Sequence, residues 1–484
     1  MLGTWRSKVE KDLGGVAFER ALVTEIAGGL RMQPLYESSN RTPQRISRLA
    51  GLTLARIVYA GAPLDDLPAE RWVLGPAEPG EVSERAGESG HVVQHADRPT
   101  FHALDVHDAG GSAPLEIAVA VGRVIDALRG GASPPELSIA VASGTEIFLE
   151  VAKLRAIRAL AERCLLALGA GSRVRILART SFVGFSRIEP ETNALRATLS
   201  TVAGMLGGAD LVAVAPYDVL APSAGPHDRA SRLAGTTGLV ASLEAHLAGA
   251  EDPLHGAYLV EALTRDLMDA AWSIVRGLER SGGANAAAGS YQARLADEGH
   301  ERQRAARAAQ LPRVGASRLA RVEAPMLGAV HPSLAHVLRD TAAFERLRED
   351  RIVRPTTILV VGDPKKTAAR AEYLREVLAT WGAPASFASL AAIDAPLERG
   401  DGASWGAVAV CAEDRDFGAL SSLVRTLSSR AAVLVAGRPG PHEAALREAG
   451  AAAFVHLGAD LPAVARALYG DPRGVGASAA GGAP

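Results

Sequence analysis

The chain has 484 residues, more than one hydrophobic core usually supports, so at least two domains are expected. Hydrophobic residues make up 48% of the chain and aromatic residues only 4%, which predicts an interior of Ala, Val and Leu, as in helices packed on parallel strands. The 52 basic and 54 acidic residues nearly cancel, and no basic block alternates with aromatic residues, so nucleic acid is not an expected partner.

Signals for secretion and for membrane insertion are weak. The N-terminal stretch MLGTWRSKVEKDLGG lacks the apolar centre of a signal peptide, and no apolar run reaches the length of about 18 residues that a membrane span needs. The two cysteines, Cys164 and Cys411, lie in or beside apolar runs, which predicts buried free thiols in a reducing compartment. We therefore expect a cytoplasmic protein that contacts no membrane.

The first half of the chain predicts an arm followed by a barrel. Residues 1–50 are polar and partly helical, as expected for a dimerisation arm. Over residues 51–330, short apolar runs alternate with helical patterns, which predicts a parallel sheet closed into a (β/α)8 TIM-type barrel. The runs expected to form strands are 55–60, 71–74, 91–93, 137–142, 173–178 and 211–214.

One helix of this region is predicted in detail. Ser143 and Glu146 have the spacing of a capping box, and apolar residues then recur at helical spacing until Gly169. The opposite face is polar, and we expect it to be solvated. Its members are Glu150, Lys153, Arg155, Arg158, Glu162 and Arg163.

The second half predicts a linker and a smaller domain. Residues 281–355 are Gly/Ala-rich and then Arg-rich, and we assign 331–355 as the linker. Residues 356–470 alternate five apolar runs with helical patterns, which predicts a flavodoxin-like, doubly wound domain, and the Gly/Ala-rich tail 471–484 is expected to be disordered. The expected strands are 357–361, 385–388, 407–411, 432–436 and 452–457.

Several motifs occur in an order that resembles the methylmalonyl-CoA mutases. The stretch from Phe148 to Arg158 resembles the helix that follows a central barrel strand in that family. Three further stretches are similar to its arm, its Asn-x-x-Arg and Leu-Gly-Gly segment, and its Tyr-x-Val-Glu-x-Leu-Thr helix: Trp5 with Val9, Phe18-Glu19 and Pro34-Leu35-Tyr36; Asn193 to Arg196 with Leu206-Gly207-Gly208; and Tyr258 to Thr264. The resemblance implies adenosylcobalamin-dependent interconversion of methylmalonyl-CoA and succinyl-CoA.

The resemblance also shows where the substrate-binding residues of the family are absent. Catalytic chains have a His in the stretch Gly-Gly-Thr-Gln-Ser-Leu-His, and counting from Gly207-Gly208 places Ala213 at that position. A methyl group cannot donate a hydrogen bond to a thioester oxygen. The segment Pro-Tyr-Asn-Asn reads Pro190-Glu191-Thr192-Asn193 here, and no counterpart of Arg-Pro-Trp-Thr-Ile-Arg-Gln-Tyr follows Tyr36. We therefore expect no catalytic residue in this chain.

The residues that correspond to the cobalt-binding loop of the family also differ from the family pattern. Its pattern Asp-x-His-x-x-Gly corresponds to Asp363, Lys365 and Ala368, so a lysine replaces the histidine that ligates cobalt. A protonated lysine has no lone pair for a metal. Arg438 also stands where small residues would line the nucleotide tail. Residues 356–470 are thus expected to form a degenerate cobalamin-binding-like domain without cofactor.

These departures resemble the small, beta-type subunit of the heterodimeric bacterial mutases. The resemblance implies a noncatalytic chain that stabilises a catalytic large subunit, which binds adenosylcobalamin and through which acyl-CoA is reached. Two alternatives stay open: an independent acyl-CoA mutase with a rearranged site, and a regulatory module that binds acyl-CoA or a nucleotide. Turnover by the chain alone would favour the first alternative, and tight acyl-CoA binding without a partner chain would favour the second.

Three other groups of polar residues were weighed as sites. Lys365 and Lys366 lie at an expected helix N-terminus and could bind an anion, although a solvated basic pair is the ordinary outcome. Ser181, His255 and the nearby acids match no nucleophile motif. The third group fits no compact zinc pattern, so no metal site is predicted. It comprises His91, His95, His102 and His107 with Asp105 and Asp108.

Overall fold

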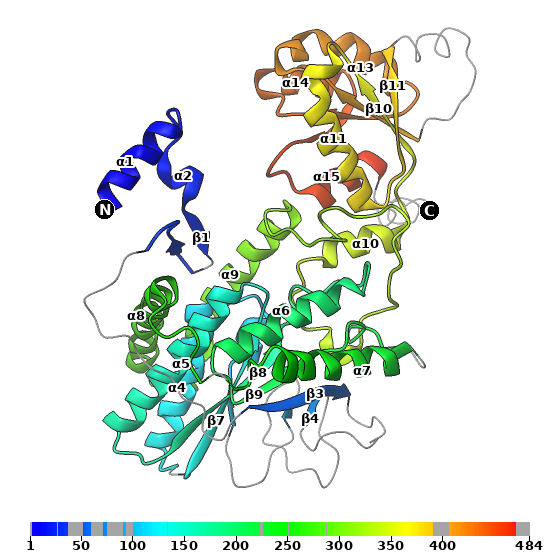
Figure 1. Ribbon diagram of the computed structural model, residues 1–484. Coiled ribbons are helices and arrows are strands. Elements are labelled where there is room, and N and C mark those ends of the chain that lie inside the picture. The colour runs from blue at the N-terminus through cyan, green and yellow to red at the C-terminus, as the bar shows by residue number, and fades with distance from the viewer. Residues whose placement is uncertain are drawn as a thin grey trace, which may run out of the picture. The chain divides into compact units, whose positions relative to one another are not determined.

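The computed structural model describes most of the chain as two compact units (Figure 1). Unit 1 falls within Met1–Phe185, Asn193–His300 and Ala329–Leu338, and unit 2 within Ser186–Thr192, Glu301–Gly328 and Arg339–Pro484. The domain boundaries assigned from the sequence stay predictions, and the tail 471–484 lies outside the described residues. The described ranges are 2–26, 28–36, 52–59, 71–74, 91–92, 100–132, 134–222, 226–249, 251–286, 288–390 and 406–470.

The N-terminal segment contains two short helices and a hairpin. These are α1 (Leu2–Asp12), α2 (Phe18–Leu22) and the antiparallel strands β1 (Thr24–Ile26) and β2 (Leu30–Met32). The rings of Trp5 and Phe18 meet edge to face at 6.0 Å, and the Arg6 guanidinium lies 4.4 Å from the Phe18 ring centre. These contacts join α1 to α2. A role of the segment in dimerisation stays a prediction.

Unit 1 is built on a seven-stranded sheet in the order β5-β4-β3-β9-β8-β7-β6. All neighbouring strands run parallel except β4 and β5. All six predicted runs overlap strands, whereas β6 was not predicted. The parallel α/β class is confirmed, but no pairing among the described residues joins β5 to β6 and closes a barrel. The strands are β3 (Thr53–Tyr59), β4 (Arg71–Leu74), β5 (His91–Val92), β6 (Thr100–His102), β7 (Glu136–Ser143), β8 (Arg173–Thr180) and β9 (Leu211–Val214).

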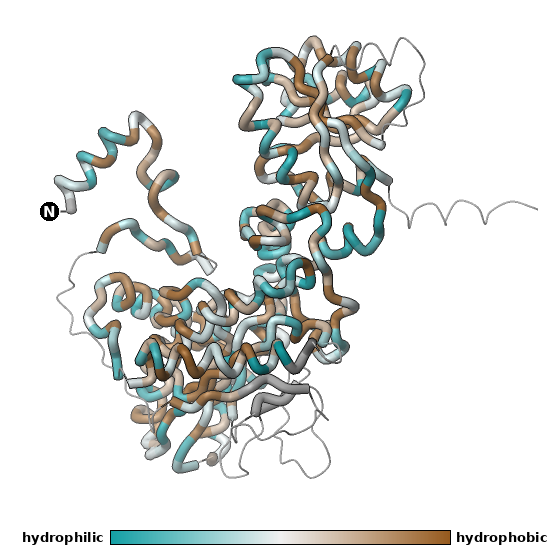
Figure 2. Tube along the Cα trace, turned by 45° about the vertical axis from the view of Figure 1, so that its right-hand side comes forward, coloured by the Kyte–Doolittle hydropathy of each residue, from teal (hydrophilic) through white to brown (hydrophobic). Residues whose placement is uncertain are grey.

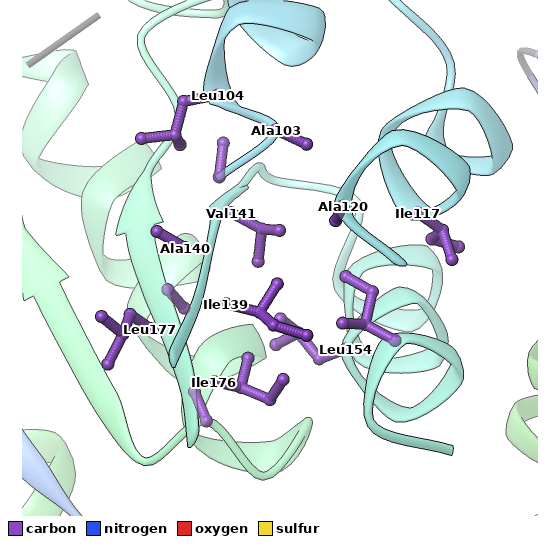
Figure 3. Close-up of a cluster of buried hydrophobic side chains, with 14 of the residues drawn as sticks. Ala103, Leu104, Ile117, Ala120, Ile139, Ala140, Val141, Leu154, Ile176 and Leu177 are labelled. Carbon is purple, nitrogen blue, oxygen red and sulfur yellow. The ribbon is translucent and has the colours of Figure 1, made fainter. Parts of the chain in front are cut away.

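Helices cover this sheet and bury it. Residues 137–143 of β7 are all buried, as expected for a parallel strand covered on both faces. Figure 3 shows Ile139, Val141 and Ile176 from the strands beside Leu154 and Ile117 from two helices. The helices of unit 1 are α3 (Leu104–Asp108), α4 (Ala113–Arg129), α5 (Ile147–Ala167), α6 (Thr192–Leu206), α7 (Pro226–Leu239), the π-helix η1 (Val240–Glu244), α8 (Tyr258–Arg280), α9 (Ala288–Arg307, which continues into unit 2) and the 3₁₀ turn η2 (Pro332–Leu334).

Helix α5 departs from its prediction in two ways. Ser143 is the last residue of β7 and its hydroxyl donates to the Ser200 carbonyl at 3.1 Å, so the predicted capping box with Glu146 is wrong. The predicted solvated face is also wrong for four of its six members. Because α5 packs against both α4 and α8, side chains on both of its faces are covered. Glu150, Lys153, Arg155 and Arg158 are buried, and only Glu162 and Arg163 are exposed.

Unit 2 contains a five-stranded parallel sheet in the order β11-β10-β12-β13-β14. The first strand lies between the second and the third, which is the flavodoxin-like order, and the predicted strands are confirmed. Helix α10, inside the predicted linker, buries Phe344 and Leu347 in the core of this unit. The elements are α10 (Ala342–Asp350), β10 (Thr356–Val360), α11 (Pro364–Trp381), β11 (Ala385–Ser389), β12 (Ala407–Cys411), η3 (Asp414–Ala419), α13 (Leu420–Ser428), β13 (Ala432–Ala436), η4 (Gly440–His442), α14 (Glu443–Glu448), β14 (Ala451–Val455) and α15 (Leu461–Tyr469).

The helices of both units mix hydrophobic with hydrophilic residues. Figure 2 shows hydrophobic and hydrophilic residues interspersed along the helices of both units. None of the helices in the described part of the chain combines the length and the apolarity that a bilayer span requires. Cys164 and Cys411 are buried free thiols, as predicted, and burial raises the pKa of each to about 11.

The close packing of α4 generates a first prediction. A methyl group at Gly122, inside α4, would lie 2.8 Å from the Ala284 Cβ, whereas a methyl at Gly277, inside α8, would meet no described atom within 4 Å. We expect Gly122→Ala to lower the free energy of unfolding by about 1–3 kcal/mol because the backbone must shift. Gly277→Ala is the matched control and should raise that energy by about 0.5–1 kcal/mol through helix propensity. Urea denaturation of both variants measures the difference, and equal effects would contradict the packing described.

Candidate functional site

The carboxyl ends of the parallel strands of unit 1 gather polar side chains. Ligands and catalytic groups in parallel α/β proteins are found at this edge, because the loops that follow the strands meet there. Strand β6 leads into α3, β7 ends at Ser143, and Ser181 directly follows β8. Helix α4 then brings its first turn to the same edge, since the Glu116 carboxylate accepts the Ala142 amide at 3.1 Å.

An imidazole connects three of these elements. The Nε2 atom of His107, on α3, lies 2.6 Å from Ser181 Oγ, and its Nδ1 atom lies 3.2 Å from Glu116 Oε2. The backbone of Ser181 is held in place as well, because its N–H donates to the Ser143 carbonyl at 2.8 Å. We call these three side chains, Ser181, His107 and Glu116, the serine–histidine–glutamate chain.

Lys153 of α5 forms a buried ion pair with Glu116 of the serine–histidine–glutamate chain. Lys153 Nζ lies 2.8 Å from Glu116 Oε2 and 2.7 Å from Glu150 Oε2, and it donates to the Ala142 carbonyl at 2.8 Å. Burial by itself would raise the pKa of Glu116, but the Lys153 ammonium and His107 lower it to about 2. Burial likewise opposes the charge on Lys153, yet the two carboxylates raise its pKa above the ordinary value. The pair is therefore ionised and fixed in the interior.

A second buried pair lies beside the first. Arg179, at the end of β8, donates two hydrogen bonds to Asp108 at 2.9 and 2.6 Å, and its guanidinium lies 4.3 Å from the Phe182 ring centre. His336 Nε2 is 3.7 Å from the same carboxylate. Burial would raise the pKa of Asp108, but the Arg179 charge and the nearby His336 ring keep it below the usual range. The interior at this edge is thus filled by paired charges.

The structure places the residues that the sequence singled out in both units. Ala213 lies on β9 of unit 1, fully buried, and its carbonyl accepts the Thr180 hydroxyl at 3.1 Å. In unit 2, Asp363 caps α11 by accepting the Lys365 amide at 2.9 Å. The side chains of Lys365 and Ala368 are exposed.

The histidine cluster that was weighed as a metal site does not assemble one. Among the described residues, no group of three or more His, Cys, Asp or Glu side chains is placed to hold a metal ion. His102 Nδ1 lies 3.6 Å from Asp105, and His107 faces Glu116 and Ser181. The side chain of His91 and all of His95 lie outside the described residues.

The serine–histidine–glutamate chain was missed at the level of the sequence. Ser181 was compared with His255, but His255 lies 3.7 Å from Asp252 instead. Strand β6 was not predicted, so nothing placed His107 at a strand end. Glu116 sits in a helix pattern that looks amphipathic. The available signal was Ser181 itself, which follows a predicted strand at the edge where parallel strands end.

The two strand orders and the polar edge of unit 1 define a two-unit α/β protein with a flavodoxin-like second unit. The sequence profile described as Methylmalonyl-CoA mutase matches residues 101–355, more than half of the chain. The chain therefore belongs to the methylmalonyl-CoA mutase family.

Named relatives include small subunits of this enzyme. The chain is 34% identical over 216 residues to the probable methylmalonyl-CoA mutase small subunit of Mycobacterium tuberculosis, a match that covers 42% of this chain and 34% of the relative. It is 35% identical over 198 residues to the small subunit of Streptomyces virginiae (39% of this chain, 32% of the relative) and 30% identical over 197 residues to that of Propionibacterium freudenreichii subsp. shermanii (38% and 30%). The chain thus spans about a third of the length of the curated relatives it matches.

The residues of unit 2 do not fit the cobalt ligation that the family implies. At the predicted ligand position the donor is the exposed ammonium of Lys365, which offers no lone pair while protonated. Arg370 of α11 donates to the carbonyls of Ala412 and Ala436, the former directly beyond β12 and the latter at the end of β13. Gly437 follows with φ +128°, and a Cβ there would lie 2.6 Å from the Phe417 ring. Protein groups therefore occupy the edge at which sheets of this order bind ligands.

The ionised Glu116 generates a prediction of pH dependence. Its pKa is about 2 in the folded chain against an ordinary value of 4.5, so it contributes stability above pH 4.5 that is lost as the pH falls toward 2. We expect Glu116→Gln to lower the free energy of unfolding by roughly 3–5 kcal/mol at pH 7, because Lys153 loses a buried partner. The loss should shrink between pH 4.5 and 2.

Urea denaturation from pH 7 down to pH 3 measures this dependence. Glu448→Gln removes an exposed carboxylate and is the matched control, with an expected change within about 0.5 kcal/mol at every pH. A Glu116→Gln loss that stays constant over this range would show that Glu116 is not the ionised partner of Lys153.

Proposed function

We propose that this chain is the small, noncatalytic subunit of an adenosylcobalamin-dependent methylmalonyl-CoA mutase. In this proposal the catalytic large subunit binds the cofactor and the acyl-CoA, interconverts methylmalonyl-CoA and succinyl-CoA, and is stabilised by this chain. The observation that carries the proposal is the ammonium group of Lys365 at the cobalt-ligand position of a unit with the flavodoxin-like strand order.

The surroundings of Lys365 support a lost cofactor site. Asp363, the acidic residue of the family pattern, is used as the N-cap of α11. Arg370 pairs with Asp414 at 2.6 Å and spans two strand ends, so reopening the edge would break an ion pair and two hydrogen bonds. A neutral imidazole is an ordinary ligand for a transition metal, whereas a lysine ammonium is not.

Unit 1 also supports the absence of mutase catalysis in this chain. Ala213 is fully buried in the core, and a methyl group there offers no hydrogen bond to a substrate. The site residues proposed to have lost their function are therefore Ala213, Asp363, Lys365 and Ala368, which agrees with catalysis in a partner.

The strand order of unit 1 supports the proposal that its parallel sheet belongs to a (β/α)8 barrel. Strands β6, β7, β8 and β9 are neighbours in chain order, and β9 then pairs with β3, the first strand of the sheet. Pairing of the last strand with the first is what a barrel requires. We propose that β5 and β6 flank the remaining gap of this barrel. The predicted domain boundaries, the arm's role in dimerisation and the cytoplasmic location stay predictions.

Exposed leucines on unit 1 support a partner. Leu239, at the end of α7, and Leu243, in η1, lie four residues apart and are 50% and 65% exposed. Leu233 and Val240 on the same two helices are also exposed, which makes this the leucine face of α7 and η1. Contiguous exposed apolar residues are typical of interaction surfaces, and we propose that the catalytic large subunit covers this one.

The proposal predicts that the chain alone binds no cobalamin. After incubation with adenosylcobalamin and gel filtration, we expect the protein fraction to lack the cobalamin absorption spectrum, because no imidazole occupies the ligand position. Lys365→Met should behave like the original chain, since neither side chain ligates cobalt. A stoichiometric cobalamin spectrum in the protein fraction would refute the assignment of the cofactor to the partner.

The proposal also predicts activity only in a complex. Co-expression with the catalytic large subunit should give a heterodimer that turns over methylmalonyl-CoA, whereas this chain alone should not. We expect Leu243→Arg to weaken the heterodimer at least tenfold, while Leu166→Arg, at an 83% exposed leucine of α5, should leave it unchanged. Co-purification and turnover measure both effects. Turnover by this chain alone would favour an independent mutase instead.

A further inference from the structure

The serine–histidine–glutamate chain has the connectivity of a nucleophilic triad. Ser181 Oγ lies 2.6 Å from His107 Nε2, and His107 Nδ1 lies 3.2 Å from the Glu116 carboxylate. A general base within hydrogen-bond reach of the hydroxyl, oriented in turn by a third group, is the arrangement that activates a serine. We propose that Ser181 is a nucleophile, activated by His107, that hydrolyses short acyl esters or thioesters.

The surroundings of Glu116 fix the roles of the three groups. The Oε1 atom of the ionised carboxylate accepts a hydrogen bond from the Ala142 amide. Its Oε2 atom accepts one from Lys153 and lies within hydrogen-bond distance of His107. An acceptor at Nδ1 requires the proton of a neutral imidazole to sit on that nitrogen, so Nε2 carries the lone pair that faces Ser181. Glu116 therefore acts as the positioning residue and His107 as the base.

The position of Ser181 suits a nucleophile. It follows the last residue of β8 in a tight turn, in which the Phe185 amide donates to the Phe182 carbonyl at 3.0 Å. Among the described residues, no group accepts a hydrogen bond from the amide of Phe182. The backbone N–H of the residue after a nucleophile is a common donor to the oxyanion of acyl transfer.

Exposure and chemistry narrow the substrate class. Ser181 is 8% exposed and the His107 side chain 14%, so only a small group reaches the hydroxyl. The turn beyond Ser181 is apolar, with Phe182, Val183 and Phe185 all buried. This combination favours a short, uncharged acyl group on an ester or thioester over a large or charged one.

The chemical step balances with water as the only co-reactant. Ser181 Oγ forms a bond to the acyl carbonyl carbon while its proton passes to His107 Nε2, and the bond to the alcohol or thiol breaks as that group takes the proton. Water then gives a proton to His107 Nε2 and bonds to the acyl carbon, and the bond from that carbon to Ser181 Oγ breaks as Oγ takes the proton back from His107. The products are a carboxylic acid, the free alcohol or thiol, and the regenerated hydroxyl. This inference does not rest on the mutase proposal, because it uses only side chains of this chain.

The test uses the full chain, a fluorophosphonate probe and p-nitrophenyl acetate. We expect the probe to label the unaltered protein at Ser181, as mapped by peptide mass spectrometry, and p-nitrophenyl acetate to be hydrolysed. Ser181→Ala should abolish labelling, and His107→Gln should reduce the rates by about 10²–10⁴-fold, the usual contribution of a general base. Acetyl-CoA with thiol detection then distinguishes thioester from ester hydrolysis.

A matched control separates nucleophilic chemistry from loss of structure. Ser138→Ala removes another buried hydroxyl, on β7, that has no hydrogen-bond partner among the described residues, and labelling should be unchanged. Peptide mapping of the unaltered chain keeps the test valid even where a variant unfolds. Labelling at another residue, absence of labelling, or undiminished hydrolysis by a folded Ser181→Ala variant would overturn the proposal.

Discussion

The buried ion pair between Lys153 and Glu116 is the constraint on which the polar edge of unit 1 depends. Their side chains are each 1% exposed and 2.8 Å apart, and the pair connects α5 to the first turn of α4. Charges taken out of water must be paired and hydrogen-bonded, because the cost of leaving either alone is several kcal/mol. Glu150 and the Ala142 carbonyl are further partners of Lys153, and the Ala142 amide donates to the second oxygen of Glu116.

The position of the Glu116 carboxylate determines what the neighbouring groups do. Glu116 contacts the His107 ring, and the ring in turn contacts Ser181, which follows β8. The ion pair between Asp108 and Arg179 joins the same two segments a second time. Asp108 directly follows His107, and Arg179 lies two residues before Ser181. Two adjacent ion pairs therefore make this edge rigid, which is the condition that a positioned hydroxyl and base require.

The carboxyl edges of the two sheets carry different kinds of side chain. In unit 1 the edge carries an ordered set of polar side chains around His107. In unit 2 Arg370 bridges the edge, and Lys365 lies exposed in the first turn of α11. The chain belongs to the methylmalonyl-CoA mutase family, and its second unit has the flavodoxin-like strand order. The fold of such a unit can persist without ligand because its parallel sheet has its own hydrophobic core.

The sequence by itself determined the parallel α/β class, every strand of the two large sheets but β6, and the family. Apolar runs bounded by turn residues predicted most strands, because the length and the period of such runs are local properties of the sequence. Only the tertiary structure decided that the polar face of α5 is buried, since Lys153, Arg155 and Arg158 find partners on other elements far along the chain. It also decided the meeting of Ser181 with His107, 74 residues apart, because the pairing of β6, β7 and β8 brings the segments after β6 and β8 together.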